Sequence, residues 1–241
     1  MSPATKPFRF KQFRVHHDRS TMKVGTDAIA LGAWAQCQQP NRILDVGTGC
    51  GLIALMLAQR FPDAIVDAVE PDAPSAEQAG QNFADSPWSR RLRCRPSDIQ
   101  QFHADSPYDL MVCNPPFFHS GPISPQSARA AARHAITLTW DDLVTVATRL
   151  LSASGSLCVV LPSESEPAAI ASAQAAGLFP RHCCRIRGRA QSPIRRVLLQ
   201  LTRESGACRR DELTIEHRRH EYTPAWAALT ADFLLKTPDP T

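Results

Sequence analysis

Short apolar segments alternate with segments of helical period along most of the chain. Strands are predicted at residues 42–46, 64–70, 92–95, 108–113, 157–161, 181–187 and 195–202. Helices are predicted at residues 26–37, 52–61, 139–151 and 167–176, after strand 64–70 through about residue 84, and from Thr223 onward. This alternation predicts an α/β fold whose mostly parallel, seven-stranded sheet carries helices on both faces. Because strand-like sequence dominates the end of the series, we expect an antiparallel strand at one edge.

Composition adds few constraints to that pattern. The 241 residues are 43% hydrophobic and 21% charged, which is ordinary for a globular protein. We predict a single domain over residues 1–241, in which a basic segment and a helix (residues 1–38) pack onto the core. No apolar run approaches the roughly 20 residues that cross a bilayer, and the amino terminus lacks the apolar stretch of a signal peptide. We therefore predict a cytoplasmic protein.

The eight cysteines show no metal-binding spacing. None forms a C-x-x-C pair, and no pair of histidines lies near one at zinc-finger spacing. Several lie inside apolar runs, where a thiol behaves as a small hydrophobic side chain. We expect reduced cysteines and no metal site.

A glycine-rich turn follows the first of the strands predicted above. Residues 45–51 read Asp-Val-Gly-Thr-Gly-Cys-Gly, between a strand and a helix, where open α/β sheets bind ligands. The dinucleotide fingerprint G-x-G-x-x-G fails here, because Leu52 stands at its third glycine. Glu70 is placed to accept hydrogen bonds from ribose hydroxyls, and Asp98 from an adenine amino group. Either acid alone could be a solvated loop residue, but both, like Asp45, lie near the carboxyl end of a strand.

A second motif, Asn114-Pro115-Pro116-Phe117, follows strand 108–113. A prolyl pair after a strand is usually only a loop, but this one faces the nucleotide site at the same sheet edge. The nitrogen of an aromatic amino group is a poor nucleophile, and accepting both its hydrogens favours a pyramidal nitrogen aimed at a donor methyl group. The side-chain oxygen of Asn114 and the carbonyl of Pro115, held rigidly by the proline ring, could be these acceptors. Phe117 could stack on a base, and such a stack is worth about 1–3 kcal/mol.

The net charge is only +4, but the basic residues, most of them arginines, are concentrated in residues 6–23 and 181–219. Such runs form either a solvated basic face or a phosphate-binding surface, and the planar guanidinium of arginine suits phosphate well. Residues near the predicted clamp, His119, Arg133 and His134, could touch a substrate or be structural.

With both motifs placed, the chain resembles the amino-group methyltransferases of the class I, Rossmann-like fold. It is most similar to the family of bacterial tRNA1(Val) adenosine N6-methyltransferases, which modify the adenosine just 3′ of the anticodon. The resemblance runs nearly end to end and rests on residues 22–34, 43–60, 86–88, 97–102, 114–118, 132–134 and the closing segment from Tyr222. The tetrad alone is shared by DNA, RNA and protein methyltransferases, whereas the first and last segments are more specific.

The resemblance implies S-adenosylmethionine as cofactor. It implies that the cofactor is held by Asp45, Gly47, Gly49, Gly51, Glu70, Asp98 and Asn114, with Lys23, Thr26 and Asp27 near its methionine end. Phe117 and Phe118 would hold the target base. The partner would be the anticodon stem-loop of a tRNA, with Arg133, Arg195 and Arg196 as candidate contacts. We expect a monomer.

Other activities remain open at this point. Ribosomal RNA guanine N2-methyltransferases share the tetrad followed by His and Gly, which residues 118–121 match in part. A protein glutamine N5-methyltransferase is another alternative, and the basic segments argue weakly against it. From a different class, a non-catalytic RNA-binding module would be expected to have lost the glycine turn or the tetrad, and this chain keeps both.

Overall fold

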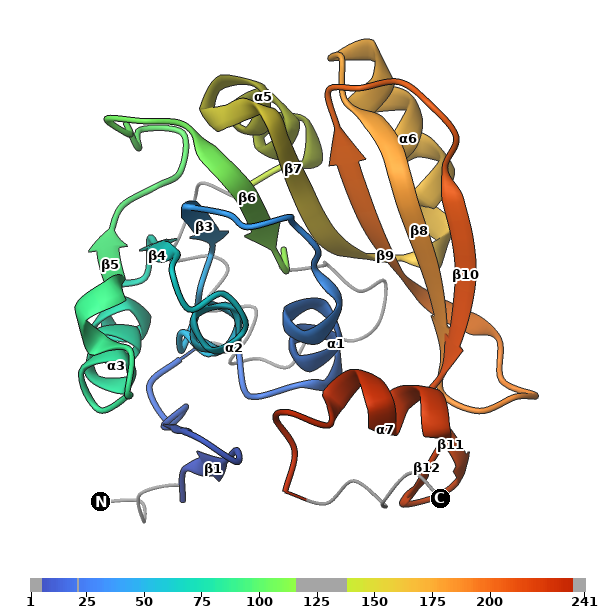
Figure 1. Ribbon diagram of the computed structural model, residues 1–241, viewed down its shortest axis with the longest axis horizontal. Coiled ribbons are helices and arrows are strands. Elements are labelled where there is room, and N and C mark those ends of the chain that lie inside the picture. Colours follow the sequence, from blue (N-terminus) through green and yellow to red (C-terminus); the bar gives the residue numbers. More distant parts are fainter. Residues whose placement is uncertain (1–5, 21, 116–137, 236–241) are drawn as a thin grey trace, which may run out of the picture.

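The computed structural model describes residues 6–20, 22–115 and 138–235, and its centre is an eight-stranded sheet (Figure 1). In spatial order the strands are β10 (Arg209–Thr214), β8 (Phe179–Arg187), β9 (Ile194–Thr202), β7 (Leu151–Pro162), β6 (Tyr108–Cys113), β3 (Arg42–Val46), β4 (Ile65–Glu70) and β5 (Leu92–Pro96).

Seven of these strands run in one direction, and β9 runs against them. β9 pairs antiparallel with β7 and with β8, and every other pair in the sheet is parallel. The predicted mostly parallel sheet is confirmed, but the antiparallel strand lies inside the sheet and not at its edge. Residues 197–199 are fully buried. A continuous apolar run of this kind is typical of a strand that is covered on both faces.

The strand that the sequence does not reveal is β10, which makes the sheet eight-stranded where seven strands are expected. Its residues read Arg-Arg-Asp-Glu-Leu-Thr, and of these Leu213 alone is buried. An edge strand with one neighbour can keep most of its side chains in water, so it lacks the apolar pattern on which the prediction depends.

Helices cover both faces of the sheet, as predicted. One face carries α1 (Thr26–Trp34), α2 (Leu52–Arg60) and α3 (Ala73–Ala84), with α7 (Pro224–Thr230) beside α1, and the other carries α5 (Trp140–Leu150) and α6 (Glu166–Ala175). Successive residues of the central strands point to opposite faces, so Ile43 joins the first core and Leu44 the second. Short 3-10 helices occupy Ser89–Arg91 and Ser163–Ser165.

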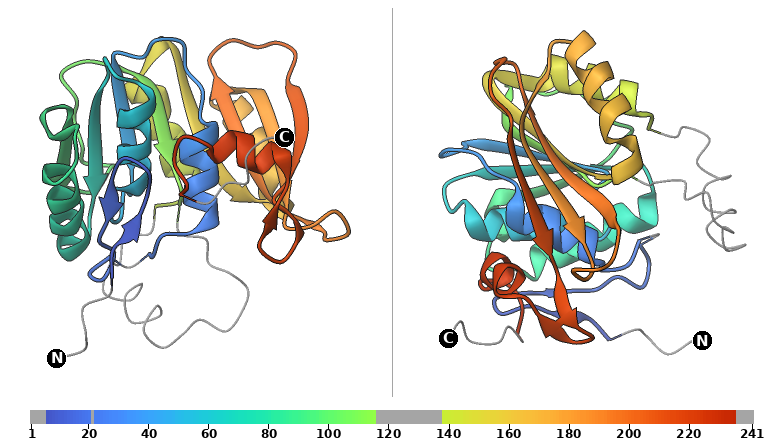
Figure 2. Two further views of the ribbon diagram at one scale, coloured as in Figure 1. Left: turned by 60° about the horizontal axis from the view of Figure 1, so that its bottom comes forward. Right: turned by 90° about the vertical axis from the view of Figure 1, so that its right-hand side faces the viewer.

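Two short hairpins that the sequence pattern does not reveal form separate two-stranded sheets outside the main sheet. They are β1 (Phe8–Arg9) with β2 (Arg14–Val15), and β11 (Glu216–Arg218) with β12 (Glu221–Tyr222). Both lie along the lower side of Figure 1, and the left view of Figure 2 brings that side forward. No helix in the described ranges is long and apolar enough to cross a membrane.

Candidate functional site

Three glycines in left-handed conformation form the turn between β3 and α2. Gly47, Gly49 and Gly51 have φ angles of 67°, 56° and 84°. The Gly47 N–H donates to the carbonyl of Val69 at 2.9 Å, which ties the turn to β4. A Cβ built on Gly51 would lie 2.5 Å from Cε1 of Phe83, whereas a Cβ on Gly47 would meet no described atom within 4 Å. Gly51 is therefore required by packing, and the backbone at Gly47 is open to close approach by a ligand.

Asp45, at the end of β3, supports this turn from below. Its Oδ2 accepts hydrogen bonds from the hydroxyl of Thr48 at 2.6 Å and from the N–H of Ala54 in the first turn of α2 at 3.1 Å. Its Oδ1 is buried without a hydrogen-bond partner in the described residues. Burial is the main cause that raises the pKa of Asp45 to about 7. The predicted cofactor residue thus orders the turn and also presents one unsatisfied oxygen.

Glu70 and Asp98 lie at the ends of the two neighbouring strands. The Glu70 carboxylate is 7% exposed and accepts from the N–H of Gly49 at 2.8 Å and from that of Asp72 at 3.0 Å. The Ser97 N–H donates to the carbonyl of Glu70 at 3.2 Å, which places the half-buried Asp98 just beyond the same strand end. The structure therefore brings the predicted acids and the glycine turn together.

Asn114 and Pro115 begin where β6 ends, one strand away from the glycine turn. Cys113 is the register partner of Val46, so the residues that follow the two strands emerge side by side, about 4.8 Å apart between strands. Both residues are half-buried. Five candidate substrate residues lie outside the described residues: Phe117, Phe118, His119, Arg133 and His134.

The start of α1 lies near the same sheet edge. Lys23 and Thr26 are exposed there, and Asp27 accepts a hydrogen bond from Nε of Arg196 at 2.7 Å. Arg196 and the exposed Arg195 lie at the start of β9. Because β9 runs antiparallel to β7, its first residues lie beside the carboxyl end of β7. Both arginines thus lie at the predicted edge, but Arg196 is engaged by the protein itself.

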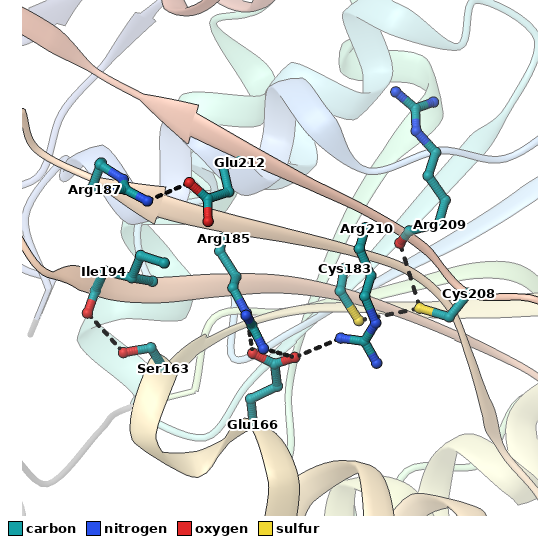
Figure 3. A network of polar contacts seen from close by, with 10 residues as sticks. All are labelled: Ser163, Glu166, Cys183, Arg185, Arg187, Ile194, Cys208, Arg209, Arg210 and Glu212. Atoms are coloured by element: carbon teal, nitrogen blue, oxygen red, sulfur yellow. Dashed lines mark hydrogen bonds and ion pairs between the residues drawn. The ribbon is translucent and has the colours of Figure 1, made fainter. Parts of the chain in front are cut away.

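Much of the basic charge in residues 181–219 is neutralised within the protein (Figure 3). The carboxylate of Glu166, 4% exposed at the start of α6, accepts from Arg185 at 2.9 Å and from Arg210 at 3.1 Å. Arg187 pairs with Glu212. These pairs join α6, β8 and β10, so a structural role explains several arginines that the sequence places in a possible phosphate-binding surface.

The amino-terminal segment reaches the glycine turn, a contact that the sequence does not specify. The side chain of Asn82 in α3 bonds both the N–H of His16, at 2.9 Å, and its carbonyl, at 2.8 Å. Gln78, one turn earlier on α3, accepts from the N–H of Ser20 at 3.0 Å. The buried Oγ of Ser20 would lie 3.3 Å from a Cβ on Gly49, and it has no hydrogen-bond partner in the described residues. The buried amides four residues apart on α3 are the signal that could have revealed this contact.

The thiols near the site are protonated at neutral pH. Burial is the main cause that raises the pKa of Cys50 to about 11 and of Cys94 to about 12, and it raises that of Cys113 well above its usual value. Among the described residues no group of three or more His, Cys, Asp or Glu could hold a metal ion.

Comparison with known proteins identifies the family to which the chain is similar. Residues 24–173 match the family described as "Methyltransferase small domain". The tRNA1(Val) (adenine(37)-N6)-methyltransferase of Christiangramia forsetii is 40% identical over 238 residues, covering 97% of this chain and 99% of that protein. The proteins of the same name from Vibrio campbellii and Flavobacterium psychrophilum are 40% and 42% identical, covering 96% and 95% of this chain and 97% and 99% of their own lengths.

Solved structures support the fold. A predicted O-methyltransferase from Agrobacterium tumefaciens superposes with a TM-score of 0.66 at 19% identity, covering 89% of this chain and 100% of its own. A TehB-like SAM-dependent methyltransferase from Corynebacterium glutamicum gives a TM-score of 0.51 at 16% identity, with coverages of 75% and 89%. The expected Rossmann-like methyltransferase fold is confirmed.

Proposed function

Since the chain belongs to the family of tRNA1(Val) (adenine(37)-N6)-methyltransferases, we propose that it methylates the N6 amino group of adenosine 37 in tRNA1(Val). The donor is S-adenosylmethionine. The observation that carries the proposal is the register of β3 and β6, which sets the glycine turn and Asn114 side by side at one sheet edge.

The residues at the glycine turn fit S-adenosylmethionine. Gly47 offers open backbone, Glu70 offers a carboxylate to ribose hydroxyls, and Asp98 offers one to the adenine amino group. The buried Oδ1 of Asp45 has no hydrogen-bond partner in the described residues and provides a further oxygen at the end of β3. When bound, the cofactor supplies an electrophilic methyl group. Lys23 and Thr26 are proposed to lie at its methionine end.

The chain's own part in the reaction is to hold the acceptor nitrogen. We assign to the Asn114 side-chain oxygen and the Pro115 carbonyl the two hydrogens of the adenine amino group. A nitrogen held in this way has its lone pair directed at the methyl donor, and such alignment is chiefly a positioning task. An adenine in the unpaired anticodon loop costs less to unstack than one in a duplex. Phe117 and Phe118 are proposed to stack on it.

One assay tests this function against its alternatives. The protein is incubated with labelled S-adenosylmethionine and, in separate reactions, unmodified tRNA1(Val), ribosomal RNA and release factor, and each product is digested and identified. We expect N6-methyladenosine from the tRNA. N2-methylguanosine from ribosomal RNA, or methylglutamine from release factor, would overturn the proposal. A tRNA in which adenosine 37 is replaced by guanosine is the matched substrate control and should accept no label.

Fewer basic residues are candidate tRNA contacts than the sequence indicates. Arg195 remains a proposed tRNA contact, because it is exposed at the correct sheet edge. Arg196 is proposed to hold α1 through Asp27 as well as to face substrate. The monomeric state, the single domain and the cytoplasmic location stay predictions.

A further inference from the structure

The β1–β2 hairpin places two arginines directly opposite each other. Its register pairs Phe8 with Val15 and Arg9 with Arg14. Directly opposite residues of an antiparallel pair share a face and have Cβ atoms about 4.5–5.5 Å apart. Val15 is fully buried, so its face is turned to the core, and both arginines lie exposed on the other face. The two positive side chains therefore stand together in solvent.

Like charges in this arrangement repel each other and weaken the hairpin. Within the described residues neither guanidinium forms an ion pair or a hydrogen bond. Arg185 and Arg210 differ in this respect, because both are neutralised by the carboxylate of Glu166. A pair of unneutralised arginines at fixed spacing is an arrangement that an external anion would stabilise.

The surface around the pair is hollowed and mixed in chemistry. Arg9 and Arg14 line a hollow of about 660 Å³ together with the exposed Gln12, whose amide can form hydrogen bonds, and Leu235, which is 59% exposed. One acidic residue, Asp85, also lines it. An open hollow with two guanidinium groups, an amide side chain and exposed apolar surface suits a phosphodiester with its flanking sugars and bases better than a small free anion.

The hairpin is tethered close to the candidate site. The chain continues from β2 along α3 to Ser20, which lies against Gly49. Six residues span at most about 20 Å, so Arg14 lies within that distance of Ser20, the residue that contacts the glycine turn. β1 and β2 also lie along the same side of the molecule as β11 and β12 (Figure 1).

We propose that Arg9 and Arg14 form a phosphate-binding pair that holds the sugar–phosphate backbone of the RNA substrate. This assignment rests on the proposed function, because the RNA is the partner named there. A guanidinium donates two parallel hydrogen bonds to phosphate oxygens, and two such groups side by side can contact neighbouring phosphates of one strand. The pair carries no base specificity, so it positions the RNA and leaves the choice of base to the clamp.

Binding measurements on a double variant test the assignment. The substitutions Arg9→Gln and Arg14→Gln together remove two charges and keep side chains that suit a strand surface. The matched control is Arg90→Gln with Arg93→Gln, which removes the same charge from exposed residues that lie outside the hollow. Fluorescence anisotropy with labelled tRNA1(Val) transcript at several salt concentrations gives Kd and its salt dependence, and methylation and S-adenosylmethionine affinity are measured on the same samples.

We expect the hairpin variant to bind tRNA about tenfold more weakly and its log Kd–log salt slope to shrink by roughly 1.5–2, while S-adenosylmethionine affinity is unchanged. Its midpoint of urea unfolding at low salt should equal or exceed that of the wild type, because the repulsion is gone. If the hairpin variant has the Kd and salt slope of the wild type, or if the Arg90→Gln/Arg93→Gln control loses as much tRNA affinity, the assignment of Arg9 and Arg14 as a phosphate-binding pair is overturned. Wild-type protein that binds tRNA without methylating it would overturn the proposed function alone, and failure to bind tRNA would overturn both.

Discussion

Alanine at Gly51 should destabilise the protein through two separable effects. Gly51 is in the left-handed region at φ 84°, where an L side chain costs about 1–2 kcal/mol. Its new Cβ would also meet Cε1 of the buried Phe83 at 2.5 Å, and overpacking of this kind typically costs about 1–3 kcal/mol. We therefore expect Gly51→Ala to lower the free energy of unfolding by about 2–5 kcal/mol, measured by urea denaturation.

Two glycines in the same part of the chain provide matched controls. Gly47→Ala has the same backbone strain, at φ 67°, with no described atom within 4 Å of the new Cβ, so it should cost only about 1–2 kcal/mol. Gly80→Ala, inside α3 with open space around its Cβ, should stabilise by about 0.5–1 kcal/mol. Equal losses for Gly51→Ala and Gly47→Ala would refute the contact with Phe83, and combining Gly51→Ala with Phe83→Leu should recover much of the difference.

Three further predictions concern the clamp, a buried acid and a pair of thiols. Asn114→Ala should lower turnover about 100-fold or more and leave S-adenosylmethionine affinity nearly unchanged, by radiolabel assay and calorimetry; unchanged turnover would contradict the clamp. The pKa of Asp45 is raised to about 7, so the folded state retains a proton that the unfolded state loses above about pH 4. The free energy of unfolding of the wild type should therefore fall, relative to that of Asp45→Asn, as the pH rises from about 4 to about 7. Urea titrations measure this, and a difference that stays constant with pH would refute it. The sulfurs of Cys183 and Cys208 are 3.4 Å apart, so diamide should oxidise the two thiols to a disulfide, seen by mass spectrometry as the loss of two hydrogens. The disulfide should raise the free energy of unfolding by about 3 kcal/mol. Cys208→Ser should abolish both effects.

The elements that the sequence predicts best are those whose side chains are buried along their whole length. β3 and α2 match their predicted positions within a residue or two because the strand is buried on both faces and the helix is almost wholly apolar. The sequence does not reveal strand β10 or the β1–β2 hairpin, because their formation depends on backbone pairing with a neighbour and leaves polar side chains in water. No periodicity in those residues records such pairing.

Charge patterns were the least informative part of the sequence for the candidate site. A count of arginines in residues 181–219 does not show that Glu166 neutralises Arg185 and Arg210, or that Asp27 engages Arg196 from 169 positions away. These contacts arise only when α1, α6, β8, β9 and β10 assemble. A count of basic residues in residues 6–23 likewise gives Arg9 and Arg14 no special weight, although the hairpin register places the two arginines opposite each other without an acidic partner in the described part of the chain.

The three acids that the sequence treats alike differ in what the fold leaves for them to do. Asp45 already accepts two hydrogen bonds from the turn, and deep burial favours its protonated form, so its first effect is on the shape of the turn. Glu70 accepts the N–H of Gly49 and lies at the end of the adjacent strand, where the same carboxylate can reach a ribose. Only the half-buried Asp98 has a carboxylate without a hydrogen bond or ion pair in the described residues. Substitution of Asp98 should therefore weaken cofactor affinity with little loss of stability, whereas changes at Asp45 should alter both.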